Sequence, residues 1–289
     1  MSDIIQLIIG GITMGCVYSL VALGFHIIYN ATGAINFAQG EQVILGGVIA
    51  VTLSDTFKLP IPVTFVLTML LAGILGMIYE RLAIHPLLGV SEIAVIMGSI
   101  AASIIFKHGI FIIWGDEEIF LSPFSAGPPV NLFGAPIIRQ SFWIMGLTLA
   151  SLAFLWIFFK HTIMGKAILA CSNNHTGARL VGISPTRVVA YTFGLSGGLG
   201  ALAGLIVAPI TFAGGPMGTV MAVKGFAASI LGGLSNATAV VLGGIVLGLL
   251  EFFIARFIST GYRDVIALTV LLIALVIRPE GLFVSGSER

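Results

Sequence analysis

The chain has 289 residues, of which 58% are hydrophobic and only 9% are charged, and its mean hydropathy is +1.13. This composition excludes a soluble domain of the same size, because such a domain needs far more polar surface. The net charge of +1 argues neither for nor against nucleic acid, and we expect no nucleic-acid partner. Apolar runs recur along the whole chain, without the alternating pattern of a membrane β-barrel. The sequence therefore predicts an all-α polytopic membrane protein with a single transmembrane domain over residues 1–289.

Four apolar segments in the first half of the chain are candidate membrane helices. They are Ile4–Ile28, Gln42–Leu53, Pro60–Tyr79 and Ile93–Trp114. A helix needs about 20 apolar residues to cross a membrane, so Gln42–Leu53 spans only if the motif before it adds helical residues. The loop Gly115–Gln140 follows the fourth segment, is the longest loop of the chain and carries three consecutive acidic residues. We expect this loop outside the cytoplasm.

Five further apolar segments make up the second half of the chain. They are Phe142–Phe159, Val188–Phe212, Val220–Leu234, Thr238–Phe257 and Val265–Ile277. The Gly-rich cluster Gly214–Gly218 precedes Val220–Leu234, which is of borderline length and either spans the membrane or re-enters it. If it spans, the chain has nine helices, with its N-terminus outside and its C-terminus inside. If it re-enters, there are eight helices and the last ones are inverted. We expect about eight to nine transmembrane helices.

Three polar side chains lie between the first two apolar segments, in the motif GAINFAQGE. They are Asn36, Gln39 and Glu41, and the flanking Gly33 and Gly40 predict a broken helix. A carboxylate near membrane depth is costly unless it faces a cavity or a partner. One interpretation is that the motif forms a gate or a wall of a translocation path, with Asn36 and Gln39 on one helix face. The other interpretation is a loop at headgroup level whose side chains only cap helix ends.

A few other polar residues occur in or near the apolar segments. Tyr18 joins the candidate path residues, although a hydroxyl group in such a segment more often bonds to its own helix or a neighbour. Lys224 follows the Gly-rich cluster, and we expect it at the outer mouth of the bundle. Glu251 and Arg256 are five residues apart and do not share a helix face, so we assign them no joint catalytic role.

The densest basic cluster lies in the polar stretch His161–Arg187. It contains Lys166, Arg179 and Arg187, and Lys160 comes just before it. Basic loops of membrane proteins stay on the cytoplasmic side, so this stretch is predicted to be cytoplasmic.

The same stretch contains the start and stop signals of a short helix. Asn174 is a good N-cap, Gly182 can end the helix in a left-handed conformation, and Pro185 prevents its continuation. These signals predict a two-turn helix over about Thr176–Val181. Such a helix below a membrane bundle suits the docking of a soluble partner, and the alternative is an ordinary cytoplasmic connector.

Motifs of enzymes and metal sites are missing from the sequence. It contains no H-E-x-x-H motif, no P-loop and no Rossmann fingerprint, and it has no Cys/His pattern for a metal. We therefore expect no catalytic residue, no cofactor and no metal. If the protein moves a solute uphill with ATP, another chain has to bind the nucleotide.

Four stretches resemble the LivH-type permeases, which are the inner-membrane subunits of branched-chain amino-acid ABC importers. The stretches are Tyr18–Gly47, Gly165–Ile183, Val223–Glu251 and Arg278–Phe283. Together they are specific for the family but not for the solute, and the resemblance covers nearly the whole chain apart from Gly115–Gln140.

The resemblance implies the permease subunit of an ATP-driven importer for branched-chain or hydrophobic amino acids or similar small solutes. Such a subunit works by alternating access in the bacterial inner membrane and is itself not an enzyme. The implied partners are a second related permease subunit, two ATP-binding subunits and an extracytoplasmic solute-binding protein. The resemblance also identifies Gly165–Ile183 as the cytoplasmic coupling segment.

The coupling segment supplies the residues expected to contact the ATPase. They are Lys166, Asn174, Arg179, Leu180, Val181 and Gly182. The family often has a basic residue where this chain has Leu169, which leaves the charged contacts to Lys166 and Arg179. Of the residues in the short helix, Leu180 and Val181 are the best apolar anchors for a groove on a partner.

Two other functions stay open at this stage. A stand-alone secondary transporter or channel would need ion ligands near the middle of the membrane, and Glu41 is the only obvious one. An ABC permease for urea or short amides is the other, because the family that the chain resembles also includes such members.

Overall fold

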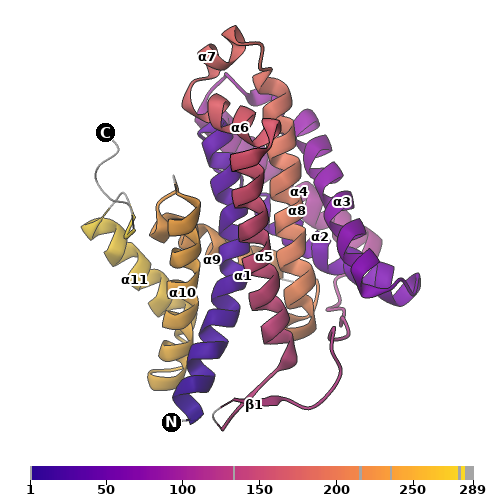
Figure 1. Ribbon diagram of the computed structural model, residues 1–289, viewed down its shortest axis with the longest axis vertical. Helices are drawn as coiled ribbons and strands as arrows, with labels where there is room; N and C mark the ends of the chain where they lie inside the picture. The colour runs from indigo at the N-terminus through magenta and orange to yellow at the C-terminus, as the bar shows by residue number, and fades with distance from the viewer. Residues whose placement is uncertain (1, 133, 215–216, 235, 279–280, 284–289) are drawn as a thin grey trace.

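The computed structural model describes residues 2–132, 134–214, 217–234, 236–278 and 281–283, and most of these residues are helical (Figure 1). The predicted cluster Gly214–Gly218 and the ending Arg278–Phe283 each lie partly outside the described residues. The helices are α1 (Ser2–Thr32), α2 (Gln39–Val51), α3 (Ile61–Tyr79), α4 (Glu92–Trp114), α5 (Arg139–His161), α6 (Ile163–Asn173), α7 (His175–Leu180), α8 (Pro185–Thr211), α9 (Met217–Gly232), α10 (Ala237–Phe257) and α11 (Arg263–Ile277). The predicted all-α fold class is confirmed.

Six of these helices are long and apolar enough to cross a membrane. They are α1, α3 together with its irregular continuation to Leu87, α4, α5, α8 and α10. The remaining three predicted segments form the shorter helices α2, α9 and α11, of 13, 16 and 15 residues. A π-helical turn over Thr52–Thr56 extends α2. Each predicted segment is therefore helical, and the number of helices that cross the membrane stays a prediction.

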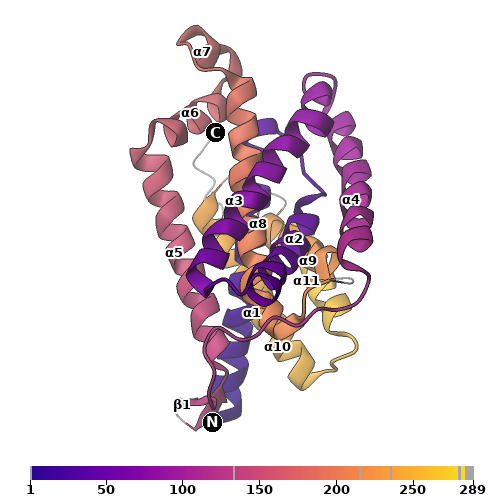
Figure 2. The ribbon, with the colours of Figure 1, turned by 90° about the vertical axis from the view of Figure 1, so that its right-hand side faces the viewer.

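Helices α1 and α8 form the centre of the bundle, where α2, α9 and α10 pack against them. Most residues of α8 and of the second half of α1 are buried. By contrast, α3, α4 and α5 leave many large apolar side chains exposed, and α4 and α5 lie on opposite flanks of the molecule (Figure 2). A surface of this kind is stable against lipid or other membrane subunits rather than water.

Small residues let the central helices approach closely. Gly204 on α8 lies against the backbone of Val43 on α2, and Gly46 on α2 lies against the backbone of Ala201 on α8. On the other side of the centre, Gly248 on α10 meets the backbone of α1 at Gly11 and Gly15. Lipid is as apolar as a leucine side chain, so membrane helices associate through this tight packing and not through a hydrophobic effect.

The two longest polar stretches lie at opposite ends of the bundle. The acidic stretch ends in a hairpin of β1 (Val130–Leu132) and β2 (Ala135–Ile137), close to the N-terminus, whereas α6 and α7 lie at the far end (Figure 1). A backbone bridge between Ile119 and Ala213 ties the acidic stretch to the chain just beyond α8. This arrangement agrees with the prediction that the acidic and basic stretches lie on opposite sides of a membrane.

Candidate functional site: a helix break, a buried charge cluster and an exposed helical loop

The predicted helix break is confirmed between Thr32 and Gln39. Gly33 has a φ of +71°, a left-handed conformation that glycine adopts without strain, and it ends α1. Asn36 lies inside the break and Gln39 is the first residue of α2. The expectation that these two residues share one helix face is therefore wrong, because the chain is not helical at Asn36.

Neighbouring helices satisfy the polar groups of the break. The Oδ1 atom of Asn36 accepts hydrogen bonds from the Tyr79 hydroxyl at 2.8 Å and from the Ala38 amide at 3.1 Å. The Ser99 hydroxyl accepts one from the amide of Phe37 at 3.1 Å. Irregular backbone at membrane depth is tolerated when protein groups satisfy it in this way.

Gln39 joins three helices. Its Oε1 atom accepts a hydrogen bond from the hydroxyl of Ser196 on α8 at 2.8 Å, and its Nε2 atom donates to the Ser196 carbonyl at 3.3 Å. The same hydroxyl lies 2.9 Å from the carbonyl oxygen of Gly24 on α1. Both ends of the Gln39 amide are thus bonded within the protein, which fits a role in holding α1, α2 and α8 together.

Glu41 is less well satisfied. Its side chain is buried, with 3% of the residue exposed, and its Oε1 atom accepts a hydrogen bond from the Ser103 hydroxyl at 3.0 Å. Its Oε2 atom has no hydrogen-bond partner among the described residues. A buried carboxylate oxygen without a partner is costly, so this group is the strongest candidate in the motif for binding a further partner.

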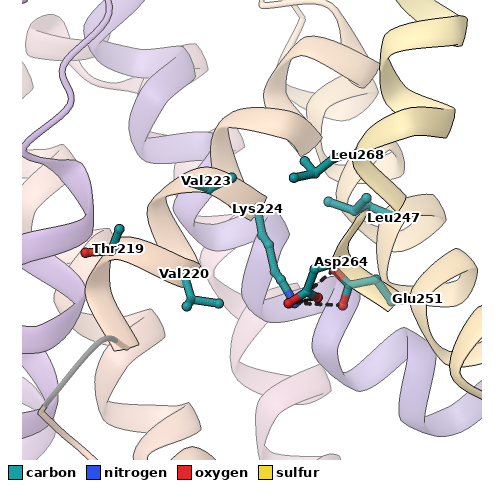
Figure 3. A pocket seen from close by; sticks show the side chains of 8 residues that line it. All are labelled: Thr219, Val220, Val223, Lys224, Leu247, Glu251, Asp264 and Leu268. Carbon is teal, nitrogen blue, oxygen red and sulfur yellow. Dashed lines mark hydrogen bonds and ion pairs between the residues drawn. The ribbon is translucent and has the colours of Figure 1, made fainter. Parts of the chain in front are cut away.

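A second, largely buried polar site connects α9, α10 and α11 (Figure 3), and α1 reaches it through Tyr18. Lys224 Nζ lies 3.0 Å from Glu251 Oε1 and 3.0 Å from Asp264 Oδ1. The hydroxyl of Tyr18 donates a hydrogen bond to Glu251 Oε2 at 2.8 Å and lies 3.3 Å from Lys224 Nζ. Tyr18, a candidate path residue, thus belongs to this charge cluster and not to the helix break.

Sequence reasoning missed most of this cluster. Lys224 is only 6% exposed and pairs with Glu251, a partner that the sequence analysis does not assign to it, while its expected place at the outer mouth stays a prediction. From the sequence, only Arg256 is considered as a partner of Glu251, so Glu251 is given no role. In the structure Arg256 lies at the surface, where its Nη2 atom is 3.6 Å from Asp3 Oδ2. A usable signal was present, because a charged residue inside an apolar segment usually pairs with another one.

The exposed helical loop at the far end has the predicted caps. The Oδ1 atom of Asn174 accepts a hydrogen bond from the Gly177 amide at 2.8 Å, and Gly182 has a φ of +83°. The short helix is α7, His175–Leu180, one residue earlier than predicted at each end. Helix α6, of 11 residues, precedes α7 and is not among the helices expected from the sequence. The Thr162 hydroxyl caps it by accepting a hydrogen bond from the Gly165 amide at 2.9 Å.

The predicted coupling residues are exposed around α7. Ala178 packs into a small core with Ile168, Cys171 and Val188, which fixes the inner face of the loop. On the outer face Leu180 is 85% exposed and Val181 is 74% exposed. Lys166 and Arg179 are exposed as well. The loop therefore presents two apolar side chains and two cations at one end of the bundle.

Within the described ranges, no three or more His, Cys, Asp or Glu side chains group together in a way that could hold a metal ion. The polar side chains are instead placed at a helix break, in the buried charge cluster and on the exposed loop.

Comparison with known proteins gives consistent matches along the chain. Residues 7–275 match a family described as branched-chain amino acid transport system / permease component. The high-affinity branched-chain amino acid transport system permease protein LivH of Escherichia coli (strain K12) is 28% identical over 291 residues, covering 96% of this chain and 94% of LivH. BraD, the corresponding permease protein of Pseudomonas aeruginosa, is also 28% identical over 291 residues, with 96% and 95% covered.

More distant similarities extend to another solute and to a solved structure. The ribose import permease protein RbsC of Haemophilus influenzae is 24% identical over 273 residues, covering 90% of this chain and 81% of RbsC. Among solved structures, PsaBC from Streptococcus pneumoniae in complex with Fab aligns with a TM-score of 0.56 and 19% identity, over 97% of this chain and 93% of the other. The structural likeness shows a shared fold.

Proposed function

Because the chain belongs to the family of branched-chain amino acid transport system permease components, we propose that it is the permease subunit of an ATP-driven importer that moves branched-chain or other hydrophobic amino acids. The observation that carries this proposal is the family match, which extends over residues 7–275. The subunit is a multi-pass protein of the cell inner membrane and assembles with other components of an ABC transporter. It is a transport component and not an enzyme.

The finer composition of the transporter is part of the proposal. A second related permease subunit completes the membrane core, two ATP-binding subunits dock on the side of α6 and α7, and a solute-binding protein delivers the solute from the other side. Closure of the ATP-binding subunits moves α7, and this movement opens the bundle to one side of the membrane at a time.

The exposed loop supports docking through its shape and its side chains. A two-turn helix is not stable alone in water, so contacts have to hold it in place. The core around Ala178 supplies these contacts on the inner face, and Leu180 and Val181 remain free to enter a groove on the partner. Arg179 and Lys166 then lie at the rim, where charges affect orientation and association rate more than affinity.

Replacing Leu180 with alanine is expected to weaken association with the ATP-binding subunits by about tenfold or more, because truncation of a central apolar anchor costs about 2 kcal/mol. The change should also uncouple ATP hydrolysis from transport while the bundle stays folded. Arg179→Ala should have a smaller effect that decreases at high salt. The measurement is pull-down of the ATP-binding subunits together with solute-stimulated hydrolysis in reconstituted membranes.

The matched control is Leu149→Ala on α5, since Leu149 is also a largely exposed leucine but lies on the flank of the bundle. This variant should retain wild-type association. If Leu180→Ala and Arg179→Ala both keep wild-type association with the ATP-binding subunits and wild-type stimulation of ATP hydrolysis, the loop is an ordinary connector. The docking surface would then lie elsewhere.

The helix break and the charge cluster are the proposed parts of the translocation path. Asn36 and Gln39 shape the break, Glu41 provides a buried carboxylate beside it, and Tyr18 reaches the path from α1. In this assignment Asn36 and Gln39 hold the wall in place through their hydrogen bonds, and Glu41 Oε2 is the group that gains a partner during transport.

Exchanging Glu41 for glutamine is expected to leave folding intact and to reduce the rate of uptake several-fold. Glutamine keeps the shape and an oxygen that can accept from Ser103, but it removes the charge that the unpartnered oxygen offers. Uptake is measured in cells at equal expression of wild type and variant. Glu92→Gln, which changes an exposed carboxylate at the start of α4, serves as the control and should transport normally. Wild-type uptake by Glu41→Gln would instead favour a purely structural role for the motif.

A further inference from the structure

A buried lysine that pairs with two carboxylates is unusual inside a membrane bundle. Lys224 comes from α9, Glu251 from α10 and Asp264 from the first turn of α11, so three different helices meet at the charges (Figure 3). Charged groups at membrane depth are costly and typically mark a path for a solute or an ion. The cluster is therefore a candidate for more than structural support.

The two carboxylates differ strongly in their surroundings. Glu251 is 1% exposed, and the Tyr18 hydroxyl holds it from the side of α1. The side chain of Asp264 is 56% exposed. The ion pair of Lys224 with Glu251 thus lies on the closed side of the cluster, and the ion pair with Asp264 lies on its open side.

A cavity of about 220 Å³ adjoins the open side. This volume is far larger than the about 10–15 Å³ that one water molecule needs, so the cavity can admit a small solute. Its walls are the two carboxylates and Lys224 together with apolar side chains of Val220, Val223, Leu247 and Leu268. Small-molecule sites commonly combine an apolar wall with a few convergent polar groups in this manner.

Building on the proposed function, we propose that this cavity binds the zwitterionic amino acid that the transporter carries. The Lys224–Asp264 ion pair opens, the solute carboxylate takes the place of Asp264 at Lys224, and the solute ammonium group pairs with Asp264. Glu251 and Tyr18 keep Lys224 in position, and the apolar walls receive an aliphatic side chain.

Charge balance favours this exchange. One lysine and two carboxylates carry a net charge of −1, and a zwitterion adds none. The solute carboxylate pairs with Lys224, and the solute ammonium group pairs with Asp264. The exchange therefore replaces one ion pair with two and leaves no charge buried and unpaired. A solute that carries only one of the two charges also breaks the Lys224–Asp264 ion pair, but it forms only one of the two new contacts. Such a solute therefore binds more weakly.

Photo-leucine, a diazirine analogue of leucine that keeps both charges, tests the site. The transporter is reconstituted with its ATP-binding subunits and its solute-binding protein, irradiated with photo-leucine, and the labelled peptides of this chain are mapped. We expect label on the peptides of α9, α10 and α11 that line the cavity. Excess leucine should remove the label, whereas equal excesses of leucinamide and 4-methylvalerate, which each lack one charge, should leave most of it.

Asp264→Asn tests the proposed exchange, because the change preserves size and affects a half-exposed side chain. Labelling should decrease by about tenfold, as expected for the loss of one charge-assisted contact. Asp3→Asn is the matched control, since it removes the carboxylate of the exposed pair with Arg256 on α10 and should not change labelling.

ATP-driven leucine uptake in the same vesicles separates the two proposals. The binding site would be overturned if the wild type takes up leucine but carries no photo-leucine label at the cavity. It would also be overturned if leucine and leucinamide prevent labelling equally. Either result leaves the importer function standing. Undiminished labelling of Asp264→Asn would overturn the ion-pair exchange. Absence of uptake of any hydrophobic amino acid by the wild type would overturn the proposed substrate class, and the site with it.

Discussion

Replacing Lys224 with methionine is expected to destabilise the folded subunit by about 3–5 kcal/mol, the usual cost of removing one partner from a buried ion pair. Glu251 is 1% exposed and would stay buried with only the Tyr18 hydroxyl as its partner among the groups of this cluster. The side-chain stem of methionine resembles that of lysine in volume, so the loss reflects the charge and not a cavity.

The free energy of unfolding is measured by denaturant titration of the purified subunit in detergent. The double variant Lys224→Met/Glu251→Gln should recover most of the lost stability, because it removes the unpaired charge as well. Asp3→Asn, at the exposed pair with Arg256, should change stability by at most about 1 kcal/mol. Equal stability of Lys224→Met and wild type would show that the cluster is hydrated and is not a buried ion pair.

A methyl group at Gly204 is expected to separate α2 from α8 and to destabilise the bundle by about 1–3 kcal/mol or more. The added Cβ atom would overlap the carbonyl oxygen of Val43, which is backbone and cannot rotate away. Gln39 joins α2 to α8 through Ser196, and a shift of α2 would disturb these hydrogen bonds too. Transport should therefore be lost together with stability.

Gly146→Ala on α5 is the matched control, because a Cβ atom at Gly146 meets no atom within 4 Å beyond its chain neighbours and the nearby backbone of its own helix. This substitution should be neutral or stabilise the helix by about 0.5–1 kcal/mol, since alanine loses less backbone entropy than glycine. Thermal unfolding and uptake are compared for both variants at equal expression. A Gly204→Ala variant as stable as Gly146→Ala would contradict the close contact between α2 and α8.

Features set by neighbouring residues could be predicted from the sequence. The break after α1 follows from Gly33 and the polar motif behind it, and α7 follows from its cap at Asn174 and its end at Gly182. In each case a few consecutive residues decide the backbone conformation. The apolar segments were predictable for the same reason, because the length of an apolar run indicates a membrane helix directly.

Side-chain partners from distant parts of the chain could not be predicted in this way. Tyr18 and Glu251 are 233 positions apart, and Gln39 and Ser196 are 157 apart. No spacing rule relates such residues, because the packing of whole helices brings them together. For this reason Tyr18 could not be separated from Asn36 and Gln39 by the sequence alone, although Tyr18 belongs to the charge cluster and the other two hold the break.

The sequence by itself determined the all-α membrane class, the approximate extent of nine apolar helices and of α7, and the family resemblance that points to a permease. Only the tertiary structure decided that Lys224 is buried, which carboxylates neutralise it, and which coupling residues remain exposed. The physical reason is that helix formation and membrane insertion depend on local composition. The surroundings of a charge, in contrast, depend on which helices pack around it, and in this bundle glycines set that packing by allowing backbones to touch.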